Sequence, residues 1–292
     1  MQSDSHAVRD ISYASSASTR AGRGFIRTIE NATGRLRLIR RAAGYQDEVA
    51  GGRDFWEVMA RRFGVSLDVV GGSLSDIPRD GPLIVIANHP YGILDGLMMG
   101  HLLAQVRGDF RILANSVFRK AGELEHVVLP VDFSGTRAAR EVNVASRRAA
   151  LDFLDGGGCV GIFPGGTVST AARPFGRAMD PAWRPFTARM IQKSGARIVP
   201  VFFDGSNSRR FQIASHVHVT LRMAFLISEF RRRVDEPVRI VIGKPLSRAD
   251  ISRYGDDARG LMAWLRAETY GLSPRPIDPW QVGYDYEERR GT

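Results

Sequence analysis

The fold is decided by the stretch from Leu83 to Gly96, which reads Leu-Ile-Val-Ile-Ala-Asn-His-Pro-Tyr-Gly-Ile-Leu-Asp-Gly. Its first five residues are all apolar, as in a strand that is buried on both faces of a sheet. Pro90 and Gly92 exclude a smooth helix in the middle of the stretch, so the chain must turn there. A helical pattern follows from Gly96 onward. This order of strand, turn and helix is typical of an α/β protein.

Apolar runs and helical patterns alternate on both sides of this stretch. Strands are predicted at residues 67–70, 83–87, 110–114, 127–131, 159–163, 197–202 and 238–242. Helical patterns lie at residues 47–63, 96–106, 137–154, 185–194 and 217–232. The alternation predicts one α/β domain, with a mostly parallel or mixed sheet of about seven strands flanked by helices.

Composition divides the chain into four regions. Residues 1–22 are rich in Ser and Ala and poor in apolar side chains, which predicts disorder. Residues 23–46 mix apolar side chains with arginines, which predicts a basic amphipathic helix. Such a helix lies either on an anionic membrane surface or against its own domain. Residues 47–272 form the expected folded domain, and residues 273–292, punctuated by Pro and Gly, an irregular tail.

The 292 residues carry a formal net charge of +10. A basic protein is attracted to nucleic acid, to anionic membranes and to phosphorylated substrates, and arginine excess also arises in GC-rich genomes. The most apolar stretch, residues 81–106, is interrupted by polar residues, so we expect no transmembrane helix there. Cys159 is the only cysteine, which excludes an internal disulfide and fits a reducing cytoplasm.

His89 is the first candidate for catalysis, because it directly follows a predicted strand and ligands bind at strand ends in α/β sheets. The turn at Pro90 and Gly92 can bring Asp95 back onto the imidazole. A carboxylate that holds one ring nitrogen leaves the other free to take a proton from a hydroxyl. The alternative is a histidine that caps a helix or is satisfied in the core. Within this string we interpret His89 as a general base.

A second glycine-containing turn follows the strand predicted at residues 159–163. It reads Pro-Gly-Gly-Thr-Val-Ser from Pro164 to Ser169. Exposed N–H groups and hydroxyls in such a loop can cradle a phosphate, and Arg173 and Arg177 can neutralise it. The simpler alternative is a tight connection between a strand and a helix. The loop is not a Walker loop, because no Gly-Lys-Ser/Thr follows at the required spacing.

The two turns together resemble those of the glycerolipid acyltransferase superfamily, the family of 1-acylglycerol-3-phosphate acyltransferase. The resemblance rests on Asn-His-Pro-x-Gly-x-x-Asp-Gly at residues 88–96 and Phe-Pro-x-Gly-x-x-Ser at residues 163–169. It is closest to a hemolysin-like bacterial branch and covers roughly residues 50–247. Further stretches agree in the same order, at residues 111–115, 129–132 and 198–208.

The resemblance implies an acyltransferase domain at residues 47–272, with His89 as general base and Asp95 as its partner. It implies acyl-CoA or acyl-carrier protein as co-substrate, with no bound cofactor and no metal. The acceptor is a lysophospholipid or related lyso-lipid of phospholipid or ornithine-lipid biosynthesis. Residues implied in acceptor binding are Asn88, Pro90, Tyr91, Gly92, Asn115, Pro164, Gly165, Gly166, Thr167, Ser169 and Arg173.

Two departures from the family pattern bear on the acceptor and on Asp95. Five residues separate His89 from Asp95, where the main family has four, and five is usual in the hemolysin-like branch. The family block Phe-Pro-Glu-Gly-Thr-Arg-Ser has lost its Glu to Gly165 and its Arg to Val168. The missing arginine argues against a glycerol-3-phosphate-type acceptor. Either Arg173 or Arg137 replaces it, or the acceptor is a lyso-ornithine lipid or another hydroxylated lipid.

The expected location is the cytoplasmic face of the bacterial inner membrane, as a peripheral protein, or the cytoplasm. An anionic membrane surface is the expected partner, and nucleic acid is not. One alternative is a thioesterase or lipid hydrolase using the same His–Asp pair, although no Gly-x-Ser-x-Gly elbow is present. Another is a non-catalytic basic protein that binds membranes or nucleic acid, although the arginines do not cluster in one motif.

Overall fold

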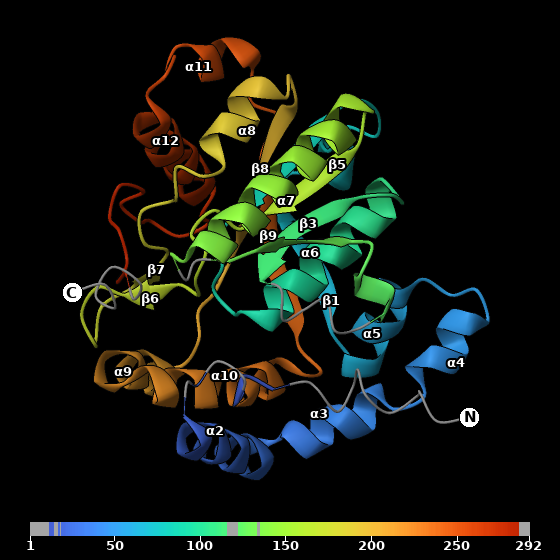
Figure 1. Cartoon of the computed structure of the whole chain (residues 1–292), viewed down its shortest axis with the longest axis vertical. Coiled ribbons are helices and arrows are strands. Elements are labelled where there is room, and N and C mark those ends of the chain that lie inside the picture. Colours follow the sequence, from blue (N-terminus) through green and yellow to red (C-terminus); the bar gives the residue numbers. More distant parts are fainter. Residues whose placement is uncertain (1–11, 15–16, 18, 116–121, 133–134, 286–292) are drawn as a thin grey trace.

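Seven strands form the main sheet of this computed structural model (Figure 1), which describes residues 12–14, 17, 19–115, 122–132 and 135–285. They are β1 (Ser66–Gly71), β2 (Leu83–Ala87), β3 (Arg111–Asn115), β4 (Val128–Val131), β5 (Cys159–Ile162), β8 (Arg197–Phe203) and β9 (Pro237–Ile242). Their order across the sheet is β1-β9-β8-β2-β5-β3-β4. All neighbours are parallel except β8 and β9, so the sheet is mixed. The predicted fold class is confirmed.

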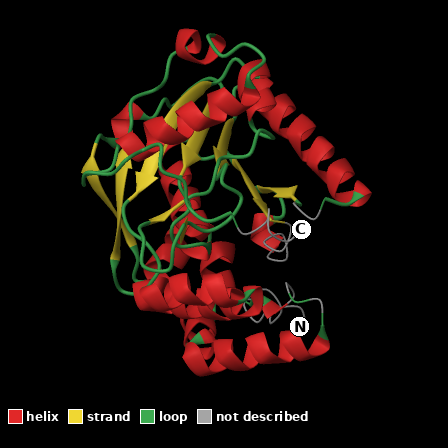
Figure 2. Cartoon of the chain, turned by 90° about the vertical axis from the view of Figure 1, so that its left-hand side faces the viewer, coloured by secondary structure: helices red, strands yellow, loops and turns green. Residues whose placement is uncertain are grey.

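Helices cover both faces of this sheet (Figures 1 and 2). One face packs on α5 (Phe55–Phe63), α6 (Ile93–Val106) and α10 (Val219–Arg233). The other packs on α7 (Arg137–Asp155), α8 (Ala188–Lys193), α11 (Arg248–Ser252) and α12 (Ala258–Gly271). The remaining elements are α2 (Arg20–Thr33), α3 (Arg35–Ala42), α4 (Tyr45–Ala50), α9 (Arg209–Val217), the short 3₁₀ turns Leu74–Asp76 and Gly122–Leu124, and a small hairpin of β6 (Thr170–Ala171) and β7 (Ala178–Met179).

Strand β2 lies at the centre of the sheet, and this position explains why all five of its residues are apolar. Leu83 and Val85 point into the core beneath α6, whereas Ile84 and Ile86 point into the core beneath α7 and α12. All four side chains are fully buried. Because both faces of β2 are covered, no position in it can be polar until the strand ends at Ala87. The chemistry therefore begins at the next two residues.

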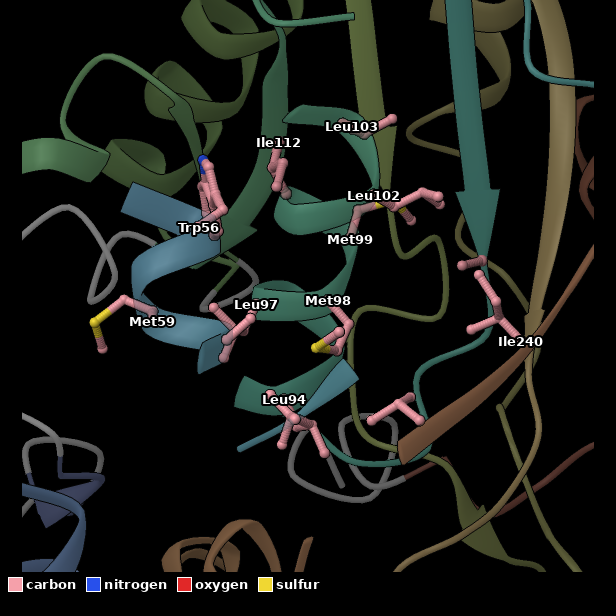
Figure 3. Packing of buried hydrophobic residues seen from close by; sticks show 14 of the residues in the cluster. Trp56, Met59, Leu94, Leu97, Met98, Met99, Leu102, Leu103, Ile112 and Ile240 are labelled. Carbon is pink, nitrogen blue, oxygen red and sulfur yellow. The ribbon is translucent and has the colours of Figure 1, made fainter. Parts of the chain in front are cut away.

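Helix α6 is held rigidly against α5 by a close approach at Gly100. A Cβ atom at this position would overlap the ring of Trp56. Figure 3 shows Trp56 and Met59 of α5 beside Leu97, Met98 and Met99 of α6 in the packed core. This packing fixes the helix whose first turn carries Asp95.

The start of α6 differs from the prediction, because the helix begins at Ile93 and not near Gly96. Gly92 precedes it with a φ of 87°, a conformation that residues with a side chain rarely adopt. Asp95 then occupies the third helical position. Its carboxylate accepts the N–H of Gly92 at 2.9 Å, as an acidic residue in the first turn of a helix commonly does.

The basic N-terminal segment forms two helices in place of the single one predicted at residues 23–46. Gly34 separates α2 from α3, and its φ of 133° interrupts the helix. Both helices lie under α10 in Figures 1 and 2, and they contact it. The carboxylate of Glu30 binds the hydroxyl of Ser12 and the N–H of Tyr13, so part of the segment 12–14 is tied to α2. Residues 1–11 of the predicted disordered region lie outside the described residues.

Two other helix predictions differ in the same way. The pattern at residues 47–63 is divided into α4 and α5 around Gly51-Gly52, and the pattern at 217–232 is preceded by a separate helix, α9. The break falls at His218, whose backbone is extended at φ −163° and ψ 144°. Residues 273–285 contain no helix or strand, and residues 286–292 lie outside the described part of the chain.

Candidate active site

His89 and Asp95 form a close pair at the carboxyl end of β2. Nδ1 of His89 lies 2.9 Å from Oδ2 of Asp95. The same carboxylate oxygen accepts the N–H groups of Tyr91, at 2.7 Å, and Gly92, at 2.9 Å. The ring N–H is not aligned with that oxygen well enough to form a hydrogen bond, so the contact is electrostatic in this state. Catalytic contacts in proteins without substrate are often misaligned in this way.

The two members of the pair differ in exposure. The side chain of Asp95 is 0% exposed, whereas that of His89 is 19% exposed. Burial raises the pKa of the Asp95 carboxyl above its usual range, and the imidazole and the two N–H groups oppose this rise only in part. The His89 ring packs on that of Phe163, with centroids 4.5 Å apart. The imidazole is thus open to a substrate, while the acid is sealed behind it.

Asp180 fixes the main chain of His89 from the opposite side. Its Oδ1 atom accepts the N–H of His89 at 3.1 Å and the hydroxyl of Ser169. Its Oδ2 atom accepts the indole N–H of Trp183 at 2.8 Å. The N–H of Ser169 in turn donates to the carbonyl of His89 at 2.8 Å. One buried carboxylate therefore joins the turn after β2 (residues 88–92, the histidine turn) to the turn after β5 (residues 164–169, the glycine turn).

The glycine turn follows β5 and packs against Asp180. The N–H of Gly166 donates to the carbonyl of Phe163 at 3.1 Å, which closes the turn, and Gly166 has a φ of 68°. A Cβ atom on Gly165 would lie 3.1 Å from Oδ2 of Asp180, so a side chain has little room there. Since proline has no N–H, the N–H of Gly165 is the one donor of Pro164-Gly165-Gly166 with no partner among the described residues.

A buried arginine on α10, Arg222, holds the remainder of this loop. It donates to the hydroxyl of Thr167 at 3.1 Å, the carbonyl of Val168 at 2.8 Å and the hydroxyl of Thr170 at 2.6 Å. Its guanidinium also lies over the ring of Phe211, 4.9 Å from the centroid. The hydroxyls of the loop are therefore engaged with the protein, Ser169 through Asp180 and Thr167 through Arg222.

Asn88 and Tyr91 connect the histidine turn to the end of β8. The Asn88 amide bonds both main-chain groups of Phe203, at 3.0 Å and 2.7 Å. The hydroxyl of Tyr91 donates to the carbonyl of Asp204 at 3.1 Å, and the guanidinium of Arg233 lies over its ring. Both side chains are buried and hold the turn in place. Pro90, between them in sequence, is buried in the same turn.

The structure does not bring every predicted residue to one place. Asn115 is exposed at the end of β3, which is separated from β2 by β5. Arg173 is exposed on the loop before β7, where its carbonyl accepts the N–H of Gly176. Arg137 begins α7 and forms an exposed ion pair with Glu141. His89, Asp95 and the residues 164–169 are the predicted set that forms one continuous site.

Asp180 and Arg222 were not singled out from the sequence. Asp180 stands in a Met-Asp-Pro segment and Arg222 in an ordinary helical pattern, neither of which is a motif. The one available signal is the position of an arginine among the apolar residues of the buried helix face, because a buried arginine needs carbonyl or carboxylate partners. The partners that link them to the site, His89 for Asp180 and residues 167–170 for Arg222, lie 50 or more residues away in the sequence, so only the folded chain identifies them.

Cys159 lies at the start of β5, beside Leu83, at the opposite end of the strand from the glycine turn. It is fully buried in β5, and burial raises the pKa of its thiol to about 12. Across residues 12–285, apart from the short gaps, no group of three or more His, Cys, Asp or Glu is arranged to hold a metal ion. In the same residues no helix is long and apolar enough to cross a membrane.

A model of the acyltransferase family matches residues 25–275. The chain belongs to the acyltransferase family. This confirms the resemblance to the glycerolipid acyltransferase superfamily that the two turns indicated. The assignment to a hemolysin-like branch stays a prediction.

Two relatives of this acyltransferase carry the same name. The lyso-glycine lipid O-acyltransferase of Phocaeicola vulgatus is 23% identical over 202 residues, which are 67% of this chain and 69% of the relative. That of Bacteroides thetaiotaomicron is 25% identical over 203 residues, 67% of this chain and 71% of the relative. A crystal structure of the 1-acyl-sn-glycerophosphate acyltransferase PlsC from Thermotoga maritima has a TM-score of 0.48 and 15% identity, over 87% of this chain and 97% of that chain.

Proposed function

We propose that this acyltransferase moves a fatty acyl group from acyl-CoA or acyl-carrier protein to the hydroxyl of a lyso-lipid. The observation that carries the proposal is the 2.9 Å contact between His89 and a fully buried Asp95 at the carboxyl end of the central strand. Membership of the acyltransferase family supports it. So do the two relatives, which are named for O-acyl transfer to a lyso-glycine lipid.

In the proposed reaction His89 is the general base. Its exposed ring nitrogen takes the proton from the acceptor hydroxyl as the oxygen attacks the thioester carbonyl. A carbon–oxygen bond forms, and the carbonyl oxygen becomes an oxyanion. When the carbon–sulfur bond breaks, the imidazolium returns the proton to the thiolate, which leaves as a free thiol. Asp95 holds the ring and stabilises its charged form, and no acyl-enzyme is needed because the thioester is already activated.

The N–H of Gly165 is the proposed donor to the oxyanion. It is the N–H of the glycine turn that has no partner among the described residues, and it lies in the loop that Ser169 ties to His89. A donor of this kind stabilises the transition state more than the substrate, by about 3–4 kcal/mol in well-studied cases. The other N–H of this turn, on Gly166, is already used to close it.

The proposed acceptors are a lysophospholipid or an amino-acid lyso-lipid, such as a lyso-ornithine or lyso-glycine lipid. Gly165 and Val168 stand where the glycerophosphate-binding family block has Glu and Arg, which favours the amino-acid lyso-lipids. The names of the two relatives point in the same direction.

The proposed working surface is an anionic membrane, on the cytoplasmic face of the bacterial inner membrane. Helices α2 and α3 contain seven arginines, and Phe25 and Leu36 on them are 48% and 49% exposed. Basic and apolar side chains on one helical surface bind anionic bilayers. Co-sedimentation with vesicles containing phosphatidylglycerol tests this. Phe25→Ser with Leu36→Ser should release the protein, whereas Val144→Ser, which alters an exposed apolar side chain on α7, should not.

Acyl transfer is tested with purified protein, an acyl-CoA or acyl-carrier protein, and lyso-glycine lipid. Release of free thiol and formation of the diacylated lipid are measured together. We expect His89→Ala to lose about 100- to 10,000-fold in rate, the usual contribution of a general base. His126→Ala, which alters an exposed histidine outside the site, is the matched control. Unchanged turnover in folded His89→Ala would exclude His89 as the base.

The same assay separates acyl transfer from hydrolysis. A transferase releases thiol at a rate that depends on the lyso-lipid and forms one ester for each thiol. A hydrolase releases thiol and free fatty acid without any acceptor. Thiol release that is independent of lyso-lipid would favour the thioesterase alternative for the same His–Asp pair.

A further inference from the structure

A cavity of about 550 Å³ lies beside the histidine turn, and the proposed mechanism does not use it. Its walls come from the loop before β7, the loop after β8, the start of α9 and the ends of α10 and α12 with the segment that follows. Asn88 and Ser169 are among its lining residues. Asn88 precedes the general base, and the N–H of Ser169 donates to the carbonyl of His89 at 2.8 Å. The cavity wall thus includes the residue that directly precedes His89 in sequence.

Positive charge dominates this cavity, which we call the arginine cavity. Four arginines line it, and Asp204 is the one acidic residue among the lining residues that the structure describes. The carboxylate of Asp204 forms two ion pairs, with Arg275 at 2.8 Å and with Arg239, which lies outside the lining, at 3.4 Å. The other three arginines donate to main-chain carbonyls: Arg177 to Pro276, Arg209 to Phe175 and Arg233 to Ser206.

Carbonyls orient these guanidinium groups without cancelling their charge. Each of the three retains further N–H donors beyond the bond described, because a guanidinium has five. Such an array is suited to carboxylate or phosphate oxygens. Arg177 and Arg209 are exposed at the cavity, so they can meet a ligand without disturbing the core.

Two buried amides in the same wall also lack acceptors among the residues that the structure describes. Within those residues the Nδ2 atom of Asn207 and the Nε2 atom of Gln212 have no hydrogen-bond partner, although each residue is only 4% exposed. The Oε1 atom of Gln212 is engaged, since it accepts the N–H of Ala171 at 2.9 Å. Buried N–H groups are nearly always paired in folded proteins, so these two donors are suited to acceptor oxygens that a ligand or an ordered water brings.

We propose that the arginine cavity binds the anionic head group of the lyso-lipid and so positions its free hydroxyl at His89. This inference rests on the proposed function and assigns acceptor specificity to Arg177, Arg209 and the two amides. In this assignment, these four residues do the work of the arginine that is missing from the glycine turn, where Val168 stands instead. Phe175, 75% exposed in the cavity lining, gives the adjoining acyl chain an apolar surface. The anionic oxygens belong to a carboxylate or to a phosphate, and the experiment distinguishes the two.

The kinetic experiment uses the exposed residues, whose substitution leaves the core intact. Arg177→Gln, Arg209→Gln and the double variant are compared with Arg259→Gln, which changes an exposed arginine on α12. We expect the KM for an anionic lyso-lipid to rise about tenfold or more for each cavity substitution, as for loss of a hydrogen bond to a charged group. The ratio of kcat/KM for the anionic lyso-lipid to that for a neutral monoacylglycerol should fall by the same factor. The KM for the acyl donor should not change. A rise in donor KM alone would place the donor phosphates there and overturn the inference.

A binding experiment tests the ligand preference of the cavity in the absence of catalysis. His89→Ala protein is titrated calorimetrically with lyso-glycine lipid, lysophosphatidic acid and monoacylglycerol of the same short chain length. We expect binding of an anionic lipid, at least tenfold weaker binding of the neutral one, and loss of this difference in the double arginine variant. The tighter of the two anionic lipids identifies carboxylate or phosphate. Equal affinity for all three lipids would refute the inference.

The two proposals fail in different ways. If the wild-type protein transfers no acyl group to any lipid, the proposed function is wrong, whereas selective binding by His89→Ala still supports an anionic head-group site. If transfer proceeds and the arginine variants discriminate as the wild type does, the head-group site is wrong and the transferase assignment stands. Asn207→Leu provides an independent variant, because it removes a buried donor without changing the charge of the cavity, and it too should weaken anionic lipids selectively.

Discussion

The N–H of His89 donates to Oδ1 of Asp180 at 3.1 Å, although 91 residues separate the two along the chain. This bond anchors the backbone of the proposed general base to the loop that carries Ser169. The contact with Asp95 orients the imidazole from one side, and Asp180 fixes the main chain that bears it from the other. The position of the ring thus depends on two acids, only one of which lies near it in sequence.

Asp180→Ala should lower both stability and turnover. The substitution leaves three donors without an acceptor, the buried groups of Ser169 and Trp183 and the partly buried N–H of His89. Each orphaned donor costs about 1–3 kcal/mol, so we expect a loss of at least about 3 kcal/mol in the free energy of unfolding. Chemical denaturation measures it. Asp180→Asn retains one acceptor oxygen and should recover part of both losses; equal stability of wild type and Asp180→Ala contradicts this role.

Asp95→Asn should affect stability in a pH-dependent way. Burial raises the folded-state pKa of this carboxyl above the unfolded value of 3.8, so the fold disfavours its charged form. Its contribution is therefore most favourable below pH 3.8 and is lost as the pH rises through the folded pKa. Because asparagine does not ionise, Asp95→Asn should gain stability relative to wild type as the pH rises from about 4. Urea unfolding at a series of pH values tests this sign.

The same substitution should reduce acyl transfer. Asparagine can still accept the N–H groups of Tyr91 and Gly92, but it has no charge to stabilise the imidazolium. We expect kcat to fall, though less than in His89→Ala, while the KM for donor and acceptor changes little. A variant with wild-type kcat would show that the acid serves only to begin helix α6.

Cys159 should be chemically silent in the native protein. Its thiol is buried, with a pKa raised to about 12, so almost no thiolate forms at neutral pH. We expect no reaction with a thiol reagent until the protein is unfolded. Cys159→Ala should retain acyl transfer at close to the wild-type rate. Rapid modification of the folded protein, or loss of activity in a folded Cys159→Ala variant, contradicts the mechanism proposed above.

Gly100→Ala should separate α6 from α5. The added methyl group overlaps the ring of Trp56, and overpacking of this kind costs about 1–3 kcal/mol. Because α6 carries Asp95 in its first turn, a shift of the helix should also lower kcat. Gly96→Ala, on the same helix with open space around it, is the matched control and should be neutral or slightly stabilising. Thermal melting of the two variants compares them directly.

The sequence by itself determined the sheet, the turn after β2 and the family. Apolar runs of four to six residues are local signals, and all seven strands of the main sheet coincide with them to within a residue or two. Pro90 and Gly92 likewise fix a turn within a few residues, which is why Asp95 could be placed beside His89. Helix ends were less accurate, because breaks at Gly34 and His218 depend on backbone conformations that periodicity does not register.

Only the tertiary structure decided which distant residues complete the site. Asp180, Arg222, Asn207 and Gln212 occupy unremarkable positions in the sequence, and each acquires its role from groups that packing brings to it. Hydrogen bonds act over about 3 Å, whereas sequence patterns describe neighbours along the chain. The histidine turn could therefore be predicted from the sequence. The contact with Asp180 that anchors it, and the arginine cavity beside it, form only when the strands assemble.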